Sequence, residues 1–202
     1  SAGAGGTVIR ATNLNWNPAT TGVGDDLYAV WARSATDAFI AGDNGVILHT
    51  SDGTAFSPAN GPGADYRGLW GDATELWAVG SGGTAARSSG GDFAATTTGV
   101  TSTLNAVWGR NAADIFAAGD GGVILHYNGS SWDPMTSSVT DDVLGLWGDG
   151  SNVVAVTAAG FLLRYHDGAW SAAATPAQRA LRGVWGVGGN DPVSYTHLRA
   201  HE

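Results

Sequence analysis

Hydrophobic residues in this chain come in short runs that recur at a fixed interval. Five of these runs end in tryptophan, and the successive tryptophans are 39, 38, 39 and 38 residues apart: Trp31, Trp70, Trp108, Trp147 and Trp185. Between the runs lie Gly, Asp and Asn, which favour tight turns. The pattern therefore predicts short β-strands joined by turns, in a unit that repeats along the whole chain.

The third repeat shows the expected elements most clearly. Its apolar runs predict strands over 104–109, 115–119, 123–127 and 132–135, with polar or glycine-rich turns between them. Pro134 confines the fourth strand to a sheet edge, because proline lacks a ladder N–H. Units of about 39 residues with four short strands are typical of β-propeller blades. The predicted fold class is therefore all-β, a fragment of a β-propeller with partial blades at both ends.

The repeat also predicts the domain boundaries. We expect one propeller domain over 1–191, made of a partial blade, four blades and the start of another: 1–26, 27–65, 66–103, 104–142, 143–180 and 181–191. The first residues align with Gly119–Pro134, which makes them the second half of a blade. Residues 192–202 match no repeat and resemble a translated sequencing adapter; the alternative is a natural divergent tail. We therefore leave these residues, with His197 and His201, out of the fold prediction.

A second, longer period lies within the first. An acidic or amide residue follows the tryptophan after six residues in the odd repeats, as at Asp37, and after five in the even ones, as at Glu75. The full repeat is thus a pair of blades, 77 residues long. Growth by doubling of such pairs predicts six or eight blades in the parent protein.

Two further positions are expected to have structural roles. A small residue stands two before each tryptophan and indicates that the first strand is innermost, where blades converge: Ala29, Gly68, Ala106, Gly145 and Gly183. Each fourth strand carries an aromatic residue, which we expect to fill the layers between blades: Trp16, Phe56, Phe93, Trp132 and Trp170.

The acids that follow the tryptophans form a repeated set: Asp37, Glu75 and Asp114, with Asn152 and Asp191 at the same position. They suggest either a recurring chemical site or caps that accept backbone N–H groups in turns. A position that accepts Asp, Glu or Asn favours the cap. Arg33 and Arg110 lie four residues before Asp37 and Asp114 and are expected to pair with them at the surface.

A cationic or cationisable residue recurs in every third strand: Arg10, His49, Arg87, His126 and Arg164. In one interpretation each side chain binds a backbone carbonyl or the acid of a neighbouring blade. In the other, these residues form a ring that binds an anionic or sugar ligand, with arginine supplying a planar set of donors. These five are the candidate ligand-binding residues.

Composition narrows the possible functions. The formal net charge is -9, which argues against nucleic acid or an anionic membrane as the main partner. No apolar run approaches the ~18 residues of a membrane span, so no membrane insertion is expected. There is no cysteine, and His49 and His126 lie two blades apart without a carboxylate at fixed spacing, so no metal or cofactor is expected. The Gly42–Gly45 and Gly119–Gly122 runs are interpreted as hairpin turns rather than phosphate loops, and the acids in 25–27 and 140–143 as solvated. No catalytic set departs from the repeat, which predicts a protein that is not an enzyme.

The Trp-Gly pairs, the Gly-Asp-x-Gly hairpins and the turns after the third strands resemble the Trp-Gly repeats of secreted or surface β-propellers from high-GC bacteria such as myxobacteria. More distantly, the chain is similar to WD40/YVTN-like, BNR/Asp-box and Ycf48-like propellers. Residues 51–56 keep the Asp, Gly and aromatic ring of an Asp-box with altered spacing. The resemblance implies an extracellular, surface or periplasmic binding module.

The expected function is a non-enzymatic binding or scaffold module for a protein or cell-surface glycan. Three alternatives remain open: a lectin with one site per blade or blade pair, a fragment of a sialidase-like glycoside hydrolase whose catalytic acids lie elsewhere, and an assembly chaperone. Edge-to-edge association is also expected, because open sheet edges favour pairing.

Overall fold

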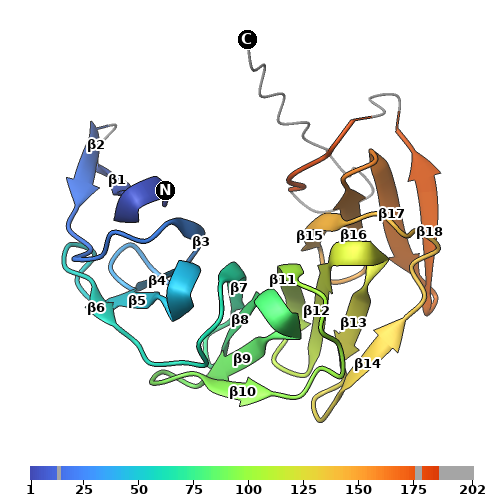
Figure 1. Ribbon diagram of the computed structural model, residues 1–202, viewed down its shortest axis with the longest axis horizontal. Coiled ribbons are helices and arrows are strands. Elements are labelled where there is room, and N and C mark those ends of the chain that lie inside the picture. Colours follow the sequence, from blue (N-terminus) through green and yellow to red (C-terminus); the bar gives the residue numbers. More distant parts are fainter. Residues whose placement is uncertain (13–14, 176–178, 187–202) are drawn as a thin grey trace. The chain divides into compact units, whose positions relative to one another are not determined.

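The computed structural model describes residues 1–12, 15–175 and 179–186 (Figure 1). The chain divides into two compact units, Ser1–Thr101 and Ser102–Glu202, each treated by itself below. Their described residues form antiparallel sheets, with short 3-10 turns as the helical elements. The all-β prediction is therefore confirmed. Asp191, His197, His201 and the proposed adapter segment 192–202 lie outside the described residues.

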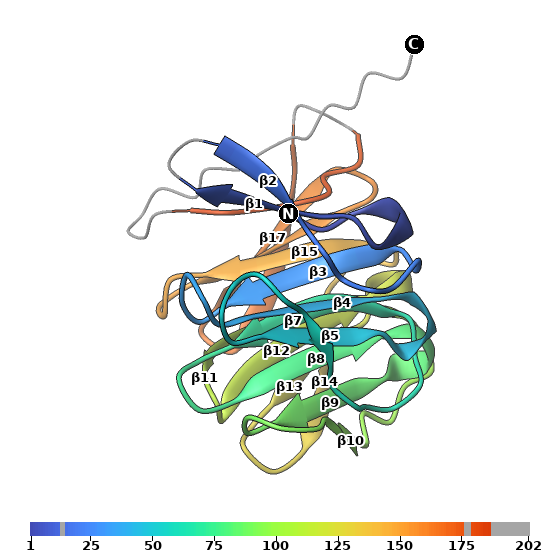
Figure 2. The same cartoon turned by 90° about the vertical axis from the view of Figure 1, so that its left-hand side faces the viewer.

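The first unit contains one two-stranded and two four-stranded sheets. The two-stranded sheet pairs β1 (Val8–Thr12) with β2 (Asn15–Ala19). The next sheet has the order β3 (Leu27–Ala32), β4 (Ala38–Gly42), β5 (Ile47–Thr50) and β6 (Ser57–Pro58). The last has the order β7 (Tyr66–Gly71), β8 (Leu76–Gly80), β9 (Ala85–Ser88) and β10 (Ala94–Thr96). Figure 2 shows β1 and β2 beside β3.

The second unit contains two four-stranded sheets of the same kind. One has the order β11 (Leu104–Asn111), β12 (Asp114–Gly119), β13 (Ile124–Tyr127) and β14 (Trp132–Met135). The other has the order β15 (Val143–Gly148), β16 (Val153–Thr157), β17 (Phe161–His166) and β18 (Ala169–Ala174). The strands predicted for the third repeat are all present, and Pro134 lies on the edge strand β14. Each four-stranded sheet is one blade.

The turn between the second and third strand of a blade depends on glycine. In η4 (Asp120–Gly122), Gly121 and Gly122 both adopt left-handed φ angles, of 68° and 75°. A Cβ atom on Gly122 would also collide with the carbonyl oxygen of Val139. The same turn recurs as η1 (Ala4–Gly6), η2 (Asp43–Gly45) and η3 (Ser81–Gly83). The prediction of hairpin turns is confirmed, and none of these helical segments in the described part of the chain could span a membrane.

Trp-Gly pairs join one blade to the next within each unit. A Cβ atom on Gly71 would lie 3.0 Å from the Trp31 ring, and one on Gly186 would lie 2.7 Å from the Trp147 ring. A Cβ atom on Gly148 would likewise collide with the Trp108 ring. The tryptophan of one blade therefore packs against the backbone of the glycine that follows the next tryptophan.

The core of each unit lies between blades. β3 contacts β7, and β11 contacts β15, which confirms that first strands of successive blades converge. Phe93 packs with Phe39 of the preceding blade, and Trp170 packs with Phe116 in the same way. The fourth-strand aromatics thus fill the layers between blades as predicted, with one correction. Trp16 is 64% exposed, because β2 belongs to a sheet of two strands.

Candidate functional site

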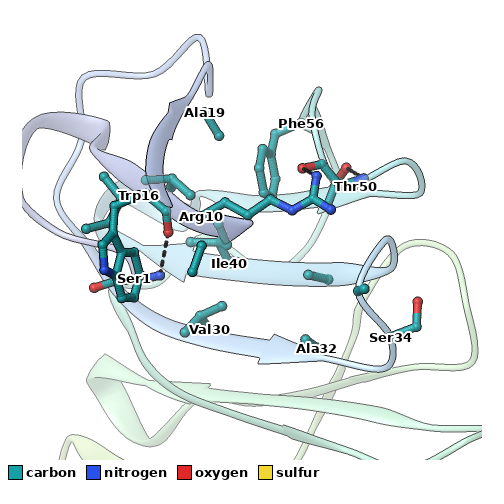
Figure 3. A pocket seen from close by; sticks show the side chains of 16 residues that line it. Ser1, Arg10, Trp16, Ala19, Val30, Ala32, Ser34, Ile40, Thr50 and Phe56 are labelled. Atoms are coloured by element: carbon teal, nitrogen blue, oxygen red, sulfur yellow. Dashed lines mark hydrogen bonds between the residues drawn. The ribbon is translucent and has the colours of Figure 1, made fainter. Parts of the chain in front are cut away.

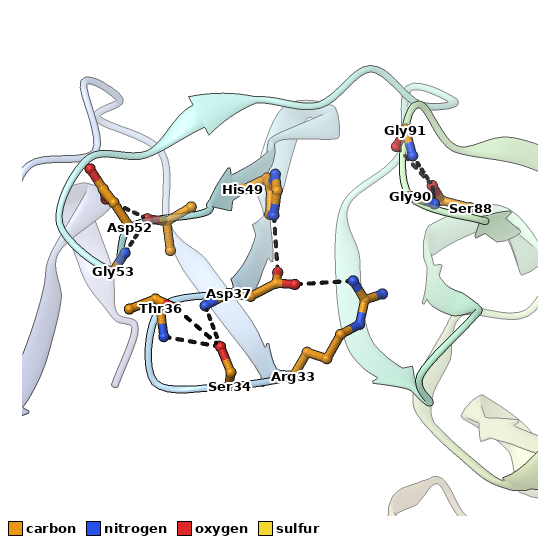
Figure 4. Close-up of polar contacts among 11 residues, drawn as sticks. Arg33, Ser34, Thr36, Asp37, His49, Asp52, Gly53, Ser88, Gly90 and Gly91 are labelled. Atoms are coloured by element: carbon orange, nitrogen blue, oxygen red, sulfur yellow. Dashed lines mark hydrogen bonds and ion pairs between the residues drawn. The ribbon is translucent and has the colours of Figure 1, made fainter.

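The first blade brings together two sets of residues that the sequence had kept apart. Asp37 directly precedes β4. Its Oδ2 atom accepts a hydrogen bond from Arg33 Nη1 at 3.0 Å (Figure 4). Its Oδ1 atom lies 3.0 Å from Nε2 of His49, on the neighbouring strand β5. The His49 ring stacks on Phe39, with ring centroids 4.2 Å apart. One carboxylate therefore bridges an arginine and a histidine that is held flat against the core.

The third blade repeats this cluster. Asp114 binds Arg110 Nη1 and His126 Nε2, each at 2.8 Å, and the His126 ring lies 4.7 Å from Phe116. Burial would raise the pKa of Asp114, but the hydrogen bonds from Arg110 and His126 and their positive charge outweigh it and lower that pKa. The predicted pairing of Arg33 and Arg110 with these acids is confirmed.

The acids of the odd blades do not cap turns, which corrects that interpretation. In the first blade the Ser34 hydroxyl accepts the N–H of Asp37, and in the third the Asn111 amide oxygen accepts that of Ala113. The even blades use an acid that directly follows the Trp-Gly pair. Asp149 Oδ1 accepts the N–H groups of Ser151 and Asn152, and these bonds lower its pKa. Asp72 Oδ1 likewise accepts the N–H groups of Thr74 and Glu75.

The even blades keep the third-strand cation with a weaker partner. Arg87 Nε lies 4.0 Å from Glu75 Oε2. Arg164 is exposed, and Asn152, at the acid position of its blade, carries no charge. The histidines of the odd blades thus bind an acid of their own blade, whereas the structural interpretation of the sequence had a backbone carbonyl or an acid of a neighbouring blade as the partner. Ligand binding by His49, Arg87, His126 and Arg164 stays a prediction.

Arg10 borders a pocket. Its Nη1 atom donates to the carbonyl oxygen of Gly53, in the next blade, at 2.8 Å. The Gly53 turn is held by Asp52, whose Oδ1 atom accepts the N–H groups of Thr54 and Ala55 at 2.7 and 3.0 Å. These two backbone bonds lower the pKa of Asp52. The partial Asp-box motif therefore acts here as a turn that presents a carbonyl to Arg10.

The pocket has a volume of about 300 Å³ and lies between the β1–β2 hairpin and the face of β3 and β4 (Figure 3). Val30 and Ile40 supply apolar surface from β3 and β4, and Arg10 crosses the opening beside Phe56. Trp16 stands at one end, next to Ser1. No Asp or Glu is among the described residues that line it. The site is therefore apolar, with one guanidinium and one exposed indole.

At one edge of the pocket, β1 has backbone groups that pair with no strand among the described residues, whereas the third strand of each four-stranded sheet pairs with a second strand on this side. Ser1 exchanges two backbone bonds with Ile9 of β1, at 2.8 and 2.9 Å. Antiparallel ladder bonds alternate in direction, so the next outward N–H and C=O on this edge belong to Ala11. Among the described residues no strand pairs with Ala11 there. An extended peptide could continue the sheet at this point.

The loop acids predicted to be solvated have a structural role instead. Oδ1 of Asp26 accepts the N–H of Gly5, in the turn of the preceding sheet, at 2.8 Å. Asp65 accepts Asn44 N–H in the same way at 3.0 Å, and Asp142 accepts Gly121 N–H at 2.9 Å. Each of these acids directly precedes the first strand of a blade, so its carboxylate ties the start of that strand to a turn of the blade before it. No group of three or more His, Asp or Glu in the described residues could hold a metal ion.

Sequence reasoning did not find the pocket or the ties between blades. The acid before each first strand was visible as a repeat, but its partner lies about 20 residues away in the preceding turn. The pocket had one usable signal. Residues 1–26 align with only the second half of a repeat, so Arg10 and Trp16 lie in a sheet of two strands where the other blades have four.

Comparisons with known proteins agree on the fold. No protein-family model and no curated protein sequence matches the chain. A solved structure described as YCF48 bound to D1 peptide matches with a TM-score of 0.67 and 16% identity, over 88% of this chain and 62% of that one. YCF48 from Cyanidioschyzon merolae matches with a TM-score of 0.61 and 14% identity, over 80% and 60%.

The WD40 β-propeller domain of Doa1 matches with a TM-score of 0.69 and 8% identity, over 92% of this chain and 62% of that one. At these identities the likeness shows the propeller fold and no specific family. The chain spans about three fifths of the length of the solved structures it matches.

Proposed function

We propose that this protein is a non-enzymatic binding module that takes an extended peptide into the pocket beside β1. The pocket itself carries the proposal, because it combines an apolar floor with a strand edge that no described strand covers. Val30 is 50% exposed on β3, where exposed residues alternate with the buried Leu27 and Ala29. A ligand that covers Val30 and Ile9 would remove apolar surface from water, which favours binding.

A peptide that pairs with β1 as an added strand would be held in one direction by its backbone hydrogen bonds. A peptide that runs antiparallel to β1 would pair its backbone with Ala11 and turn alternate side chains toward Val30 and Ile40. Arg10 has further guanidinium donors beyond the one that binds Gly53, and these could hold a carbonyl or carboxylate of the ligand. A similar propeller, YCF48, has been solved with a peptide bound, which supports a peptide as ligand.

Hydrolysis has less support than binding. Glycoside hydrolysis needs two carboxyl groups that flank the bond, and this pocket has none among its described lining residues. Residues elsewhere in a longer parent protein could still supply such acids. An extracytoplasmic location follows from the resemblance to surface propellers and is part of the proposal.

A lectin is the second candidate, and Trp16 favours it. Its indole is 64% exposed and shares the pocket with Arg10, so a sugar could stack on the ring while the guanidinium binds hydroxyl groups. Trp16→Ala would then abolish binding to a glycan array. The same variant should weaken a peptide less than Val30→Asp does, because Val30 lies on the floor.

The test is selection from a display library of random peptides, followed by affinity measurement with a selected peptide. Val30→Asp should weaken binding by about tenfold or more, because the ligand would bury an unpaired charge. Arg10→Gln should weaken it less, and Arg164→Gln should leave it unchanged. Arg164 is the matched control, since it holds the same strand position in a blade without this pocket. Equal loss in the two arginine variants would contradict the proposal.

A further inference from the structure

The four-stranded blades show which side chains lie beside the cation of a third strand. In each blade this cation is paired across the ladder with one residue of the second strand. The pairs are His49 with Phe39, Arg87 with Trp77, His126 with Phe116, and Arg164 with Val154. Side chains that are directly opposite in neighbouring strands pack together. In three of the four blades the residue opposite the cation is therefore aromatic.

An acid two residues before the aromatic position binds the same cation. Oδ1 of Asp114 lies 2.8 Å from Nε2 of His126, while Phe116 packs on the ring of that histidine. Residues two apart in a strand point to the same face, so the acid and the aromatic ring reach the cation together. The pattern of acid, apolar residue and aromatic residue occurs in three blades, as Asp37–Phe39, Glu75–Trp77 and Asp114–Phe116.

The fourth blade lacks this pattern and provides an internal contrast. Asn152 and Val154 hold the positions of the acid and the aromatic residue. Arg164, opposite Val154, is exposed, whereas His49 and His126 are partly buried. Burial of the cation in the odd blades thus goes together with the acid and the aromatic ring.

The β1 strand has the cation of this arrangement without its two partners. Ser1 exchanges two backbone bonds with Ile9. The next position along this side of β1 is opposite Arg10 and corresponds to Phe116 of the third blade. No described residue lies at that position, and Arg10 donates to the neutral carbonyl of Gly53.

The pocket beside β1 has the lining that surrounds Phe116 in the third blade. Phe116 packs against three residues of the following blade: Val153, Tyr165 and Trp170. The residues at the same positions of the first blade all line the pocket (Figure 3): Ala38, Thr50 and Phe56. The first two of these are smaller than their counterparts, which leaves room for an aromatic ring from a ligand.

We propose that this pocket selects peptides that end in an acid, an apolar residue and an aromatic residue, such as Asp-Ile-Phe. The inference rests on the proposed function and specifies its ligand. The aromatic ring would enter the pocket opposite Arg10, and the acid would pair with the guanidinium, which meets no carboxylate among the described lining residues. The apolar residue would exchange backbone bonds with Ala11. Because Ser1 lies at the next position, the aromatic residue is the last one along β1.

The experiment measures the affinity of the peptide Gly-Ser-Gly-Asp-Ile-Phe, labelled at its amino end, by fluorescence anisotropy on the full chain. The isomer Gly-Ser-Gly-Ile-Asp-Phe has the same composition but turns the acid to the other face of the strand. It should bind about fivefold more weakly or worse. Replacement of the peptide phenylalanine with alanine should weaken binding by about tenfold or more, because the apolar contact with the pocket is lost.

Arg10→Gln tests the charge pair within this complex. The variant should weaken the Asp-Ile-Phe peptide and leave the affinity of an Asn-Ile-Phe peptide nearly unchanged, because the amide has already removed the pairing. Arg164→Gln is the matched control, since it alters the same strand position in another blade, and it should affect neither peptide. Circular dichroism checks the folding of each variant.

Equal affinity of the two isomers would overturn the inference, as would equal effects of Arg10→Gln on the Asp and Asn peptides. Peptides selected from a library could lose affinity in Val30→Asp while the Asp-Ile-Phe peptide does not bind. The proposed function would then stand and the inference would fail. If no peptide responded to Val30→Asp, both would fail. Self-association of the chain that Val30→Asp abolishes would overturn the inference in favour of a second copy as the occupant.

Discussion

Odd and even blades hold the start of their second strand in different ways. The odd blades have a longer turn, which a serine or asparagine side chain caps, and this leaves Asp37 and Asp114 to bridge an arginine and a histidine. The even blades have a turn one residue shorter, which Asp72 and Asp149 cap directly. The alternating spacing of the repeat thus reflects two ways of capping the turn before the second strand with hydrogen bonds.

The difference has an energetic consequence. In the odd blades two side chains, an arginine and a histidine, bind one partly buried carboxylate, and His126 also packs against the core through Phe116. In the even blades the capping carboxylates are partly buried and accept bonds from backbone N–H groups and, at Asp72, from the Thr74 hydroxyl. Loss of an acid should therefore cost more in an odd blade than in an even one.

The largest effect is expected where an odd blade meets an even one. Gly148→Ala places a methyl group against the Trp108 ring, and we expect a loss of about 1–3 kcal/mol in the free energy of unfolding. Urea unfolding followed by circular dichroism measures it. Gly183→Ala is the control, because no atom lies within 4 Å of the Cβ position of Gly183. Gly150→Ala would not serve, because the left-handed φ of 88° at Gly150 strains alanine by itself. If Gly148→Ala left the free energy of unfolding unchanged, close packing of Trp108 against Gly148 would be contradicted.

Asp114→Asn should have the next largest effect. The amide cannot accept charged bonds from both Arg110 and His126, and we expect a loss of about 1–2 kcal/mol after allowance for partial solvent exposure. Asp167→Asn is the control, because that acid is exposed and lies outside a blade interface. A double-mutant cycle with His126→Gln should show coupling between the two residues.

The pH dependence of stability should separate Asp114 from its variant. Because the folded-state pKa of Asp114 is lowered below its ordinary value of 3.8, its contribution is present above that value and is lost as pH falls through the folded pKa. The wild-type protein should therefore lose stability more steeply below about pH 4 than Asp114→Asn does. If the free energy of unfolding, measured with urea, changed equally with pH in the two proteins, the bridge at Asp114 would not contribute to stability.

The smallest effect is expected in the even blades. Asp149→Asn keeps an oxygen that can accept the N–H groups of Ser151 and Asn152, so its loss of stability should be clearly smaller than that of Asp114→Asn. The pair of variants is compared in the same buffer at neutral pH. If Asp149→Asn destabilised the protein as much as Asp114→Asn, the odd and even blades would not differ in the way described.

Local sequence patterns determined most of the strand architecture. Strand length, turn chemistry and the position of Pro134 depend on neighbours in sequence, so the periodic runs predicted β11–β14 and their equivalents closely. The glycines of η4 were likewise readable, because left-handed turns have strong residue preferences. Pairing of Arg110 with Asp114 was predictable for the same reason, since the two lie four residues apart.

Contacts between strands and between blades were decided only by the tertiary structure. His126 and Asp114 are 12 residues apart and meet because β12 and β13 pair in one particular register. Gly148 and Trp108, and Asp142 and Gly121, meet because two blades stack. The pocket beside β1 depends on surface that a neighbouring sheet leaves uncovered. A one-dimensional repeat specifies which residues recur, but burial and partner choice are properties of packed surfaces, so they appear only once the sheets are in place.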